Sequence, residues 1–431
     1  MFRLDTDPTL LLESEERRQL RVVLRELLKE TCGPEEVRKQ AAGPRGHDRL
    51  LWERLAGEIG VQALAVPEEF GGAGYTFAEL AVALEETGRV LCPAPLLPTV
   101  VLAGHTLLRS GDRQACQRWL PGIADGSLTA TVAGFPQVAQ VTAERGAGGW
   151  VLRGEADFVL DGEGADLILV AAEAPDGTRL FACEPDHGTG AGTGAGTRTG
   201  ARTGTGTRTG TGLGVGSGTC ERVARRVLDP TRRQALVRFR GAPAEPVGEA
   251  GQAAPIMAAV LDAGRVALAA EHVGGSAHAL DAVLEYVRHR TQFGRPIGSF
   301  QVVKHRLADL LVDLEGARSA SAYATACLAG GRAELPVAAS SAAVACSGAY
   351  RLATAEYVQL HGGIGFTWEH PAHLYVRRAR ADEALFGTAD DHRLRLAGLL
   401  GLTGRTDGAS RTDGASRTDG ASRTDCSSRT D

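Results

Sequence analysis

The spacing of apolar residues changes twice along this chain. Over residues 11–29, 49–59 and 77–88 they recur every three or four positions with charged residues between them, which is the pattern of amphipathic helices. Residues 65–74, rich in Gly and Pro, interrupt this pattern. The first part of the chain, residues 10–125, is therefore predicted to be helical.

Short apolar runs bounded by turn residues follow, and they predict β-strands. The runs begin at Trp150, Asp166, Leu180 and Ala235. Helical spacing then returns from Pro255 to Gly401. Helices, then strands, then helices predict an α+β multidomain fold rather than alternating βαβ units.

A chain of 431 residues is long for one core and favours two or three domains. We predict an N-terminal helical domain over residues 1–126 and a middle β domain over 127–248. A C-terminal helical domain should span 249–401, and a repeat tail 402–431.

Two segments have low complexity. Residues 188–218, inside the β domain, are almost all Gly, Thr, Ala and Arg, and residues 405–431 repeat Arg-Thr-Asp-Gly-Ala-Ser. The first is entropically costly to order and the second has no apolar face to bury. Both are predicted to be disordered.

Composition excludes some classes of protein. With 43% hydrophobic and 23% charged residues, the chain is typical of a soluble globular protein. A net charge of −5 leaves no positive excess for a nucleic-acid partner. No stretch of about 18 uninterrupted apolar residues predicts a membrane span, and no secretory signal is evident. We expect a cytoplasmic protein.

The cysteines favour the same compartment. None is arranged as Cys-x-x-Cys, and no His cluster accompanies them, so neither a metal site nor a disulfide framework is predicted. We expect buried free thiols. The chain has eight: Cys32, Cys92, Cys116, Cys183, Cys220, Cys327, Cys346 and Cys426.

Two motifs carry the chemistry. Arg290 begins the run Arg-Thr-Gln-Phe-Gly-Arg-Pro-Ile-Gly-Ser-Phe-Gln after the predicted helix 255–289, and Gln359 begins Gln-Leu-His-Gly-Gly-Ile-Gly-Phe. With Val-Pro-Glu-Glu-Phe-Gly-Gly at residues 66–72, they resemble the acyl-CoA dehydrogenase family over nearly the whole chain outside the low-complexity segments. The resemblance implies a middle β-barrel or sandwich and a C-terminal four-helix bundle.

The resemblance also implies α,β-dehydrogenation of an acyl-CoA thioester, with FAD bound between one β domain and a neighbour's C-terminal helices and an electron-transfer acceptor as partner. Arg290 matches an arginine that meets the FAD pyrophosphate, where a guanidinium can bond two oxygens at once. Arg265 matches a substrate-side arginine. The other matching FAD contacts are Phe293, Gln301, Gln359, Gly362, Gly363 and Thr388.

The chain departs from the family on the flavin-ring side. Relatives have Trp-Ile-Thr where this chain has Phe158-Val159-Leu160. Residues 131–136 also lack the family's glycine-rich loop. This chain's own half of a flavin pocket is therefore expected to be incomplete.

The catalytic base is the larger departure. Proton abstraction needs a carboxylate within reach of the substrate α-carbon. The family's glutamate position is Phe386 here, and the position used by a minority of relatives is Gly264. Asp262, Glu271, Glu383 and Asp390 lie near these positions in the sequence and are the alternative bases.

Three hypotheses remain at this stage. The first is the base-lacking subunit of a heteromeric (α₂β₂) acyl-CoA dehydrogenase, whose paralogous partner carries the glutamate. The second is a self-sufficient flavoenzyme with a displaced base or oxygenase-like chemistry. The third is a non-catalytic binding or scaffold protein.

We expect both low-complexity segments to be dispensable for stability. Replacing residues 188–218 by a short turn, or truncating after Gly404, removes no apolar surface that we expect to be buried. The melting temperature measured by calorimetry should change by less than about 5 °C, roughly 1–2 kcal/mol for a domain of this size. A larger fall would mean that one of these segments is structured.

Overall fold

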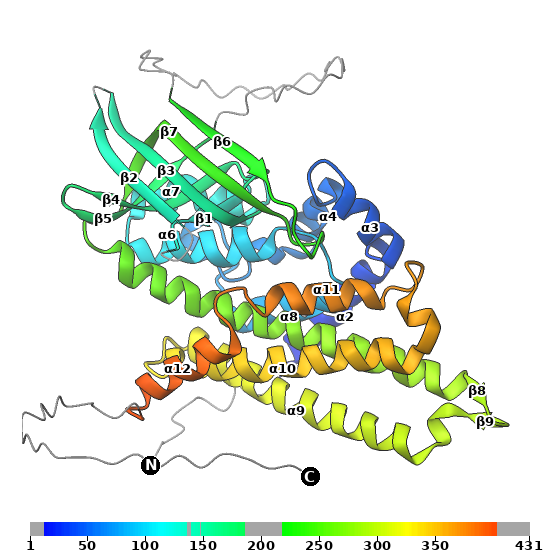
Figure 1. The fold of residues 1–431 in the computed structure, drawn as a ribbon. Coiled ribbons are helices and arrows are strands. Elements are labelled where there is room, and N and C mark those ends of the chain that lie inside the picture. The colour runs from blue at the N-terminus through cyan, green and yellow to red at the C-terminus, as the bar shows by residue number, and fades with distance from the viewer. Residues whose placement is uncertain (1–12, 136–138, 147, 186–217, 403–431) are drawn as a thin grey trace, which may run out of the picture.

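The computed structural model describes residues 13–135, 139–146, 148–185 and 218–402. The predicted insert, except Gly218, and the predicted tail after residue 402 lie outside the described residues, so their disorder stays a prediction. Helices, strands and again helices follow one another as the sequence predicted (Figure 1).

The N-terminal helices begin at residues that cap them. The Ser14 side chain accepts a hydrogen bond from the Arg17 amide at the start of α2 (Glu15–Thr31), and Thr76 with Glu79 forms a reciprocal capping box at the start of α5 (Phe77–Arg89). The other elements of this part are α3 (Pro34–Ala42), α4 (Arg49–Arg54), η1 (Leu55–Ile59), η2 (Val61–Ala63), η3 (Glu68–Phe70), η4 (Leu96–Ala103), α6 (Gly104–Ser110) and α7 (Arg113–Ala124).

The expectation of one regular helix over residues 49–59 was wrong in its second half. There the α-helix α4 widens into the π-helical η1, which ends at Gly60 with a φ of 79°. Gly57 lies inside η1 and favours helical structure poorly, which makes a regular α-helix harder to hold.

The strands form a barrel, as predicted. Hydrogen-bonded neighbours run β4-β2-β3-β7-β5 and return from β5 to β4, so that five strands close on themselves. β1 lies parallel to β4, and β6 pairs with β7. The strands are β1 (Ala130–Ala133), β2 (Ala139–Gly146), β3 (Gly149–Leu160), β4 (Leu167–Ala174), β5 (Gly177–Cys183), β6 (Thr219–Ala224) and β7 (Gln234–Val247).

Three long helices dominate the C-terminal part. α8 runs through the middle of the molecule, with the barrel and N-terminal helices on one side and α9 and α10 on the other (Figure 1). A small hairpin joins α8 to α9, and two shorter helices pack on α10. The elements are α8 (Ala253–His289), β8 (Thr291–Gln292), β9 (Arg295–Pro296), η5 (Ile297–Ser299), α9 (Gln301–Ala329), α10 (Leu335–His361), η6 (Gly362–Phe366), α11 (Ala372–Asp382) and α12 (Ala389–Leu399).

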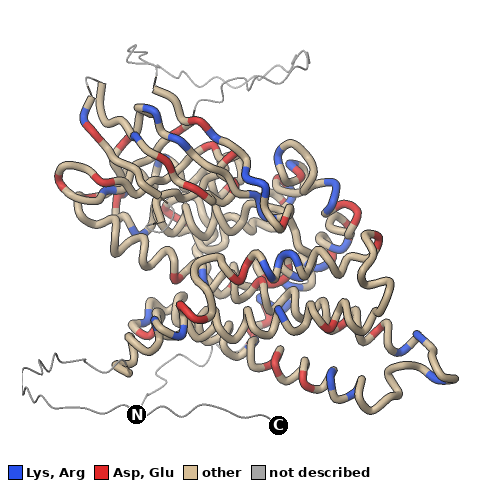
Figure 2. Tube along the Cα trace, viewed as in Figure 1, with Lys and Arg blue, Asp and Glu red and all other residues tan. Residues whose placement is uncertain are grey.

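Helix α8 is unusually apolar for its length. By length and composition it could cross a membrane, although the sequence has no uninterrupted apolar run of that length. Its most apolar window is 67% buried inside the protein, where α8 packs on α5 and α10. Figure 2 shows that most of its length carries no charged residue. A buried core helix can be as long and as apolar as a membrane span, and the packing of α8 is that of a core helix.

Glycines allow α5 and α8 to cross closely. A Cβ on Gly274 of α8 would lie 1.9 Å from the Glu85 carbonyl oxygen of α5, and a Cβ on Gly88 would lie 2.4 Å from the Glu271 carbonyl oxygen. Because the obstructing atoms are backbone, neither helix can give way by a side-chain rotation. This contact holds α8 against the N-terminal helices and so sets the position of every residue along it.

Substituting Gly274 by alanine should therefore destabilise the protein. Overpacking against backbone costs about 1–3 kcal/mol, and denaturant unfolding should show the loss. Gly316→Ala is the matched control, because Gly316 is an exposed glycine of α9 with nothing within 4 Å of its Cβ position. That change should be neutral or stabilise by up to about 1 kcal/mol. Equal unfolding midpoints for the two variants would contradict the close crossing.

Candidate active site

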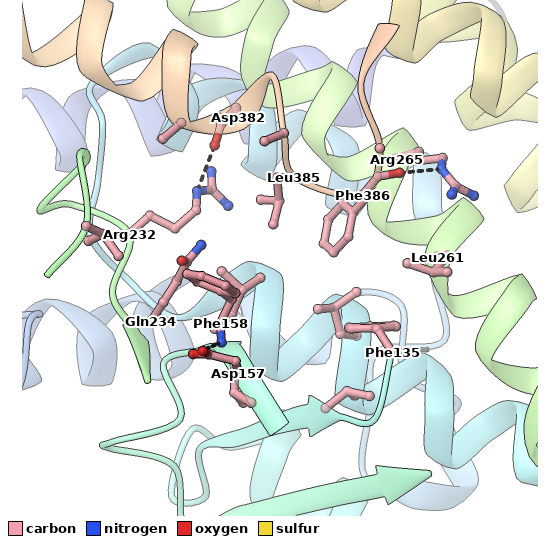
Figure 3. A pocket seen from close by; sticks show the side chains of 18 of the residues that line it. Phe135, Asp157, Phe158, Arg232, Gln234, Leu261, Arg265, Asp382, Leu385 and Phe386 are labelled. Carbon is pink, nitrogen blue, oxygen red and sulfur yellow. Dashed lines mark hydrogen bonds and ion pairs between the residues drawn. The ribbon is translucent and has the colours of Figure 1, made fainter. Parts of the chain in front are cut away.

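A cavity of about 800 Å³ lies where the barrel, α8 and the loop between α11 and α12 meet. Its walls come from segments far apart in the chain: the end of β1, the end of β3, the loop between β6 and β7, α8, and residues 381–395 (Figure 3). Most of the lining is apolar. The side chains that Figure 3 labels are Phe135, Asp157, Phe158, Arg232, Gln234, Leu261, Arg265, Asp382, Leu385 and Phe386.

Phe386 stands at the predicted base position and lines this cavity. Its ring meets Phe135 edge to face, with 6.2 Å between ring centroids, and its carbonyl oxygen accepts a hydrogen bond from Arg265 Nε at 3.2 Å. Its φ of 63° is in the left-handed region. Phe158, on the opposite wall, has a φ of 52° beside an irregularity in the pairing of β3 with β7. Such backbone is uncommon outside glycine and clusters at functional sites.

The second predicted base position lies directly against the first. A Cβ on Gly264 would be 3.0 Å from Phe386 Cε2 and 3.1 Å from Leu102 Cδ2. One phenyl ring therefore occupies the space beside both positions. A glutamate at Gly264 would have to displace Phe386, so the structure brings the two positions together and leaves neither with a carboxylate.

The alternative bases on α8 are engaged in ion pairs. Buried Asp262 accepts from Arg265 at 2.7 Å and from both terminal nitrogens of Arg395 at 2.7 and 2.8 Å. Glu271 is bonded to Arg232, and Arg378 lies 3.5 Å from it. Neither carboxylate is among the residues that line the cavity.

The alternative bases near the C-terminus are also unavailable. Glu383 pairs with Arg380 at 2.9 Å, and Asp390 pairs with Arg393 at 2.7 Å while its side chain is 87% exposed. They too are absent from the described lining of the cavity. The prediction of a displaced base among these four carboxylates thus finds no support in the geometry.

Other lining groups are poor proton acceptors. Asp157 pairs with Arg225, and its bonds to that guanidinium are the first cause that lowers the pKa of the carboxyl. Asp391 is held in the capping box of α12 by Thr388, whose hydroxyl lies 2.6 Å away and lowers its pKa. Burial, with Arg265 and Arg395 nearby, lowers the pKa of His392 to about 4. A base so weak is ill matched to neutral pH.

Asp229 and Asp382 line the cavity but belong to a buried ionic network, which we define as Asp229, Thr231, Arg232, Glu271, His272, Arg378 and Asp382. It joins the β6–β7 loop, α8 and α11. Arg378 binds Asp229 and donates to Thr231 at 2.6 Å. Asp382 lies 3.2 Å from Arg232 Nε and 3.3 Å from His272 Nε2. Burial opposes the charge of Asp382, but Arg232 and the other neighbours lower the pKa of this carboxyl.

The predicted FAD contacts, apart from Thr388, lie elsewhere. They lie where the β8–β9 hairpin and the Gln359 run meet at one end of the C-terminal helices, and we call residues 290–301 and 359–368 the bundle end. Arg290 is exposed, and its guanidinium has no hydrogen-bond or ion-pair partner among the described residues. Phe293 is 92% exposed, and Gln301 Nε2 lies 2.7 Å from His305. Figure 2 shows basic positions beside this hairpin.

The Gln359 run lies at the same end. Tyr286, near the end of α8, stacks on His361 with 4.3 Å between centroids. Gln359, Gly362 and Gly363 are exposed, and nothing lies within 4 Å of a Cβ position on either glycine. The structure therefore places the two motifs side by side on an exposed surface. Glycine backbone there, without a Cβ, allows a large ligand to come close.

This outer end is far from the cavity. Arg265 and Arg290 are separated by 25 positions of one helix, which corresponds to about 37 Å at 1.5 Å per residue. A guanidinium at Arg290 cannot reach the cavity that Arg265 lines. The cavity and the bundle end of one chain therefore serve different sites, or halves of different sites.

Sequence reasoning missed the β6–β7 loop. Residues 226–229 line the cavity, as do Arg232 and Gln234, and the side chains of Arg226 and Gln234 have no bonding partner among the described residues. The turn-forming Asp229-Pro230 step marked a loop but nothing marked it as part of a site. Only the packing of this loop on α11 places it there.

Comparison with known proteins agrees with this architecture. The N-terminal domain family of acyl-CoA dehydrogenases matches residues 14–127, and the C-terminal domain family matches residues 253–400. Acyl-CoA dehydrogenase IpdE2 of Mycobacterium tuberculosis is 35% identical over 376 residues, covering 86% of this chain and 93% of its own length.

Solved structures agree as well. A variant of the Tcur3481-Tcur3483 steroid ACAD is 29% identical with a TM-score of 0.74, covering 90% of this chain and 98% of its own. The ChsE4-ChsE5 complex from Mycobacterium tuberculosis is 25% identical with a TM-score of 0.76, covering 91% and 99%.

The chain belongs to the acyl-CoA dehydrogenase family. Members of this family are FAD-dependent oxidoreductases of lipid metabolism that act on CH–CH bonds, so the predicted family, enzyme class and cofactor are confirmed. The Arg290 guanidinium, which has no partner among the described residues, and the open Gly362 and Gly363 are suited to contact a dinucleotide. The role of each residue toward FAD stays a prediction.

The buried ionic network yields a stability prediction. Arg378→Met should cost about 3–5 kcal/mol, because it leaves Asp229 and Glu271 buried with less compensation. Arg380→Met on the same helix is the control. It removes an exposed pair with Glu383 and should cost less than about 1 kcal/mol. Urea unfolding measures both, and a mild effect of Arg378→Met would mean that the network does not hold the layers together.

Proposed function

We propose that this chain is the base-lacking subunit of a heteromeric acyl-CoA dehydrogenase that carries out α,β-dehydrogenation of an acyl-CoA thioester. The observation that carries the proposal is the Phe386 ring, which fills the space beside both base positions. Two relatives that share its architecture bear paired names, Tcur3481-Tcur3483 and ChsE4-ChsE5. A paralogous partner would supply the glutamate.

The bundle end is the part of this chain that serves the partner. Arg290 would bond the pyrophosphate of an FAD held mainly by the neighbour, Phe293 and Gln301 would contact the same cofactor, and Gln359 with Gly362 and Gly363 would receive its adenosine half. An exposed arginine without an ion pair costs little desolvation to present to phosphate. Phe366 and Trp368, 82% and 73% exposed, give this end an apolar surface suited to a protein neighbour.

The residues of the cavity would have supporting roles. FAD, when bound, supplies the acceptor for the β-hydride, and an electron-transfer protein would then accept the electrons. Arg265 orients the Phe386 carbonyl and is proposed to face the substrate, while Thr388 is proposed to contact the cofactor. No residue of the described lining takes the α-proton, so that step falls to the partner's carboxylate. We place the complex in the cytoplasm.

A self-sufficient flavoenzyme is the second candidate, because the chain keeps a cavity of about 800 Å³ despite Phe386. Oxygenase-like chemistry would not need the missing base. Flavin colour separates the two: the isolated chain should purify yellow if it is self-sufficient. It should acquire flavin only with a co-expressed partner if its bundle end completes the FAD site of that partner. A chain that acquires flavin in neither case would be the binding or scaffold protein of the third hypothesis.

Flavin retention in the complex should depend on Arg290. Arg290→Ala removes a charged, bidentate contact worth about 2–5 kcal/mol, so FAD per complex after gel filtration should fall. Arg306→Ala is the matched control, because Arg306 lies early in α9 and pairs with Glu356 at 3.0 Å. Its loss should leave the 450 nm absorbance unchanged. Equal flavin content in both variants would contradict a contact between Arg290 and the FAD pyrophosphate.

The isolated chain should not dehydrogenate acyl-CoA. General-base catalysis alone is worth about 10²–10⁴-fold, and no unpaired carboxylate lines the cavity in the part of the chain that the structure describes. The assay uses the purified chain, added FAD, a panel of acyl-CoAs and an artificial electron acceptor. Co-expression with a paralogous acyl-CoA dehydrogenase chain that carries the glutamate should give turnover that is lost when the partner's glutamate is replaced by glutamine. Robust turnover without a partner would falsify the proposal.

A further inference from the structure

One half-buried amide in the cavity wall has nothing to bond. Gln234, the first residue of β7, lines the cavity, and its side chain has no hydrogen-bond partner among the described residues. The amide is not among the polar atoms that are both unpartnered and sealed from water, so it is open to the cavity. A polar group in such a place costs free energy until a ligand bonds to it.

Most other polar groups of the described lining are already bonded within the protein. Arg226 also lacks a partner, but its side chain is exposed and can bond to water. The groups held in ion pairs or in the cap of α12 are Asp157, Asp229, Asp382, Asp391, Arg232, Arg265 and Arg395. The Gln234 amide is therefore the half-buried group that a ligand can engage without breaking an ion pair.

The register of the barrel places this amide beside a position that the sequence singled out. Gln234 lies opposite Leu160 in the antiparallel pairing of β7 with β3. Side chains that are directly opposed in such a pair project from the same face, with Cβ atoms about 4.5–5.5 Å apart. Both residues line the cavity. Gln234 thus brings a polar group to the wall where Leu160 stands in place of the family's threonine.

The surrounding walls suit a flat ring. Phe158 is 53% exposed toward this space, and Phe135 and Phe386 meet edge to face on other walls (Figure 3). Aromatic and apolar walls with few polar groups are typical of sites for planar ligands. A primary amide offers a carbonyl acceptor and N–H donors side by side. It complements an imide edge, where carbonyl and N–H groups alternate, and the pyrimidine ring of a flavin carries such an edge.

We propose that Gln234 binds the pyrimidine edge of a flavin ring in this chain's own cavity and supplies a polar contact that Leu160 cannot. The inference rests on the proposal that the cavity and Thr388 take part in flavin chemistry, and it does not depend on Arg290. A ring held by one amide and aromatic walls binds weakly. FAD is therefore retained through purification only when the partner's equivalent of the bundle end adds a pyrophosphate contact.

Riboflavin tests the proposal, because it has the ring but no pyrophosphate. The full chain, purified without a partner, is titrated into riboflavin at neutral pH while the flavin fluorescence is followed, and saturable quenching is expected. Gln234→Leu should weaken binding about tenfold, equivalent to about 1.4 kcal/mol. Gln140→Leu is the matched control, because Gln140 is an exposed glutamine of β2, and it should leave the affinity unchanged. Absence of saturable quenching, or equal affinities in all three proteins, overturns the proposal.

A second variant separates hydrogen bonding from packing. Gln234→Glu keeps the size of the side chain. An ionised carboxylate only accepts hydrogen bonds and repels the carbonyl oxygens of the ring, whereas a protonated carboxyl donates and accepts as an amide does. The riboflavin affinity of this variant should be low at neutral pH and recover as the pH falls through the pKa of the introduced carboxyl. An affinity that does not change with pH would assign Gln234 a packing role and contradict the proposal.

Two further titrations identify the ligand and separate this inference from the proposed function. Uridine carries the same imide edge on a smaller ring and should bind at least several-fold more weakly than riboflavin. Equal affinity would make a nucleobase the ligand and the flavin assignment wrong. Arg290→Ala should leave riboflavin binding unchanged, because its effect is limited to FAD retention in the complex. Loss of riboflavin binding in Arg290→Ala would place the ring at the bundle end and overturn the role of Gln234.

Discussion

The buried ionic network is the interaction on which the rest of this structure depends. Its charged groups are nearly inaccessible to water and come from the β6–β7 loop, α8 and α11, which belong to different parts of the chain. Removing such charges from water is costly, and the cost is offset only when partners are placed correctly. The network therefore disfavours any arrangement in which the barrel, the central helix and α11 are displaced, and it holds the wall of the cavity between them.

This arrangement explains why the described lining of the cavity offers no unpaired carboxylate, although several carboxylates lie around it. Asp229 and Asp382 are committed to the network, Asp262 neutralises Arg265 and Arg395, and Asp157 neutralises Arg225. A carboxylate that already binds an arginine has its oxygens occupied and is not free to approach a substrate carbon. Phe386 adds an apolar ring against Gly264, so no further carboxylate could enter without displacing it. The described walls of the cavity are therefore mostly apolar, and their carboxylates are already bonded within the protein.

The length of α8 separates this cavity from the exposed ligand-binding motifs. One end of the helix contributes Arg265 to the cavity, and the other presents Arg290 to solvent beside the Gln359 loop. Because the helix spans about 37 Å between these residues at 1.5 Å per residue, its two ends belong to separate sites. The close crossing of α5 and α8 at Gly88 and Gly274 fixes how far each end projects. The geometry of this one helix therefore keeps the cavity and the exposed motifs apart.

The sequence by itself determined the order of helices and strands, the family, and the absence of glutamate at positions 264 and 386. These are local facts of periodicity and motif, which a single segment carries. It could not determine that Phe386 rests on Gly264, that Asp262 and Glu271 are already paired, or that the β6–β7 loop lines the cavity. Such relations join residues that are tens to more than a hundred positions apart, and only the packing of barrel, central helix and α11 decides them.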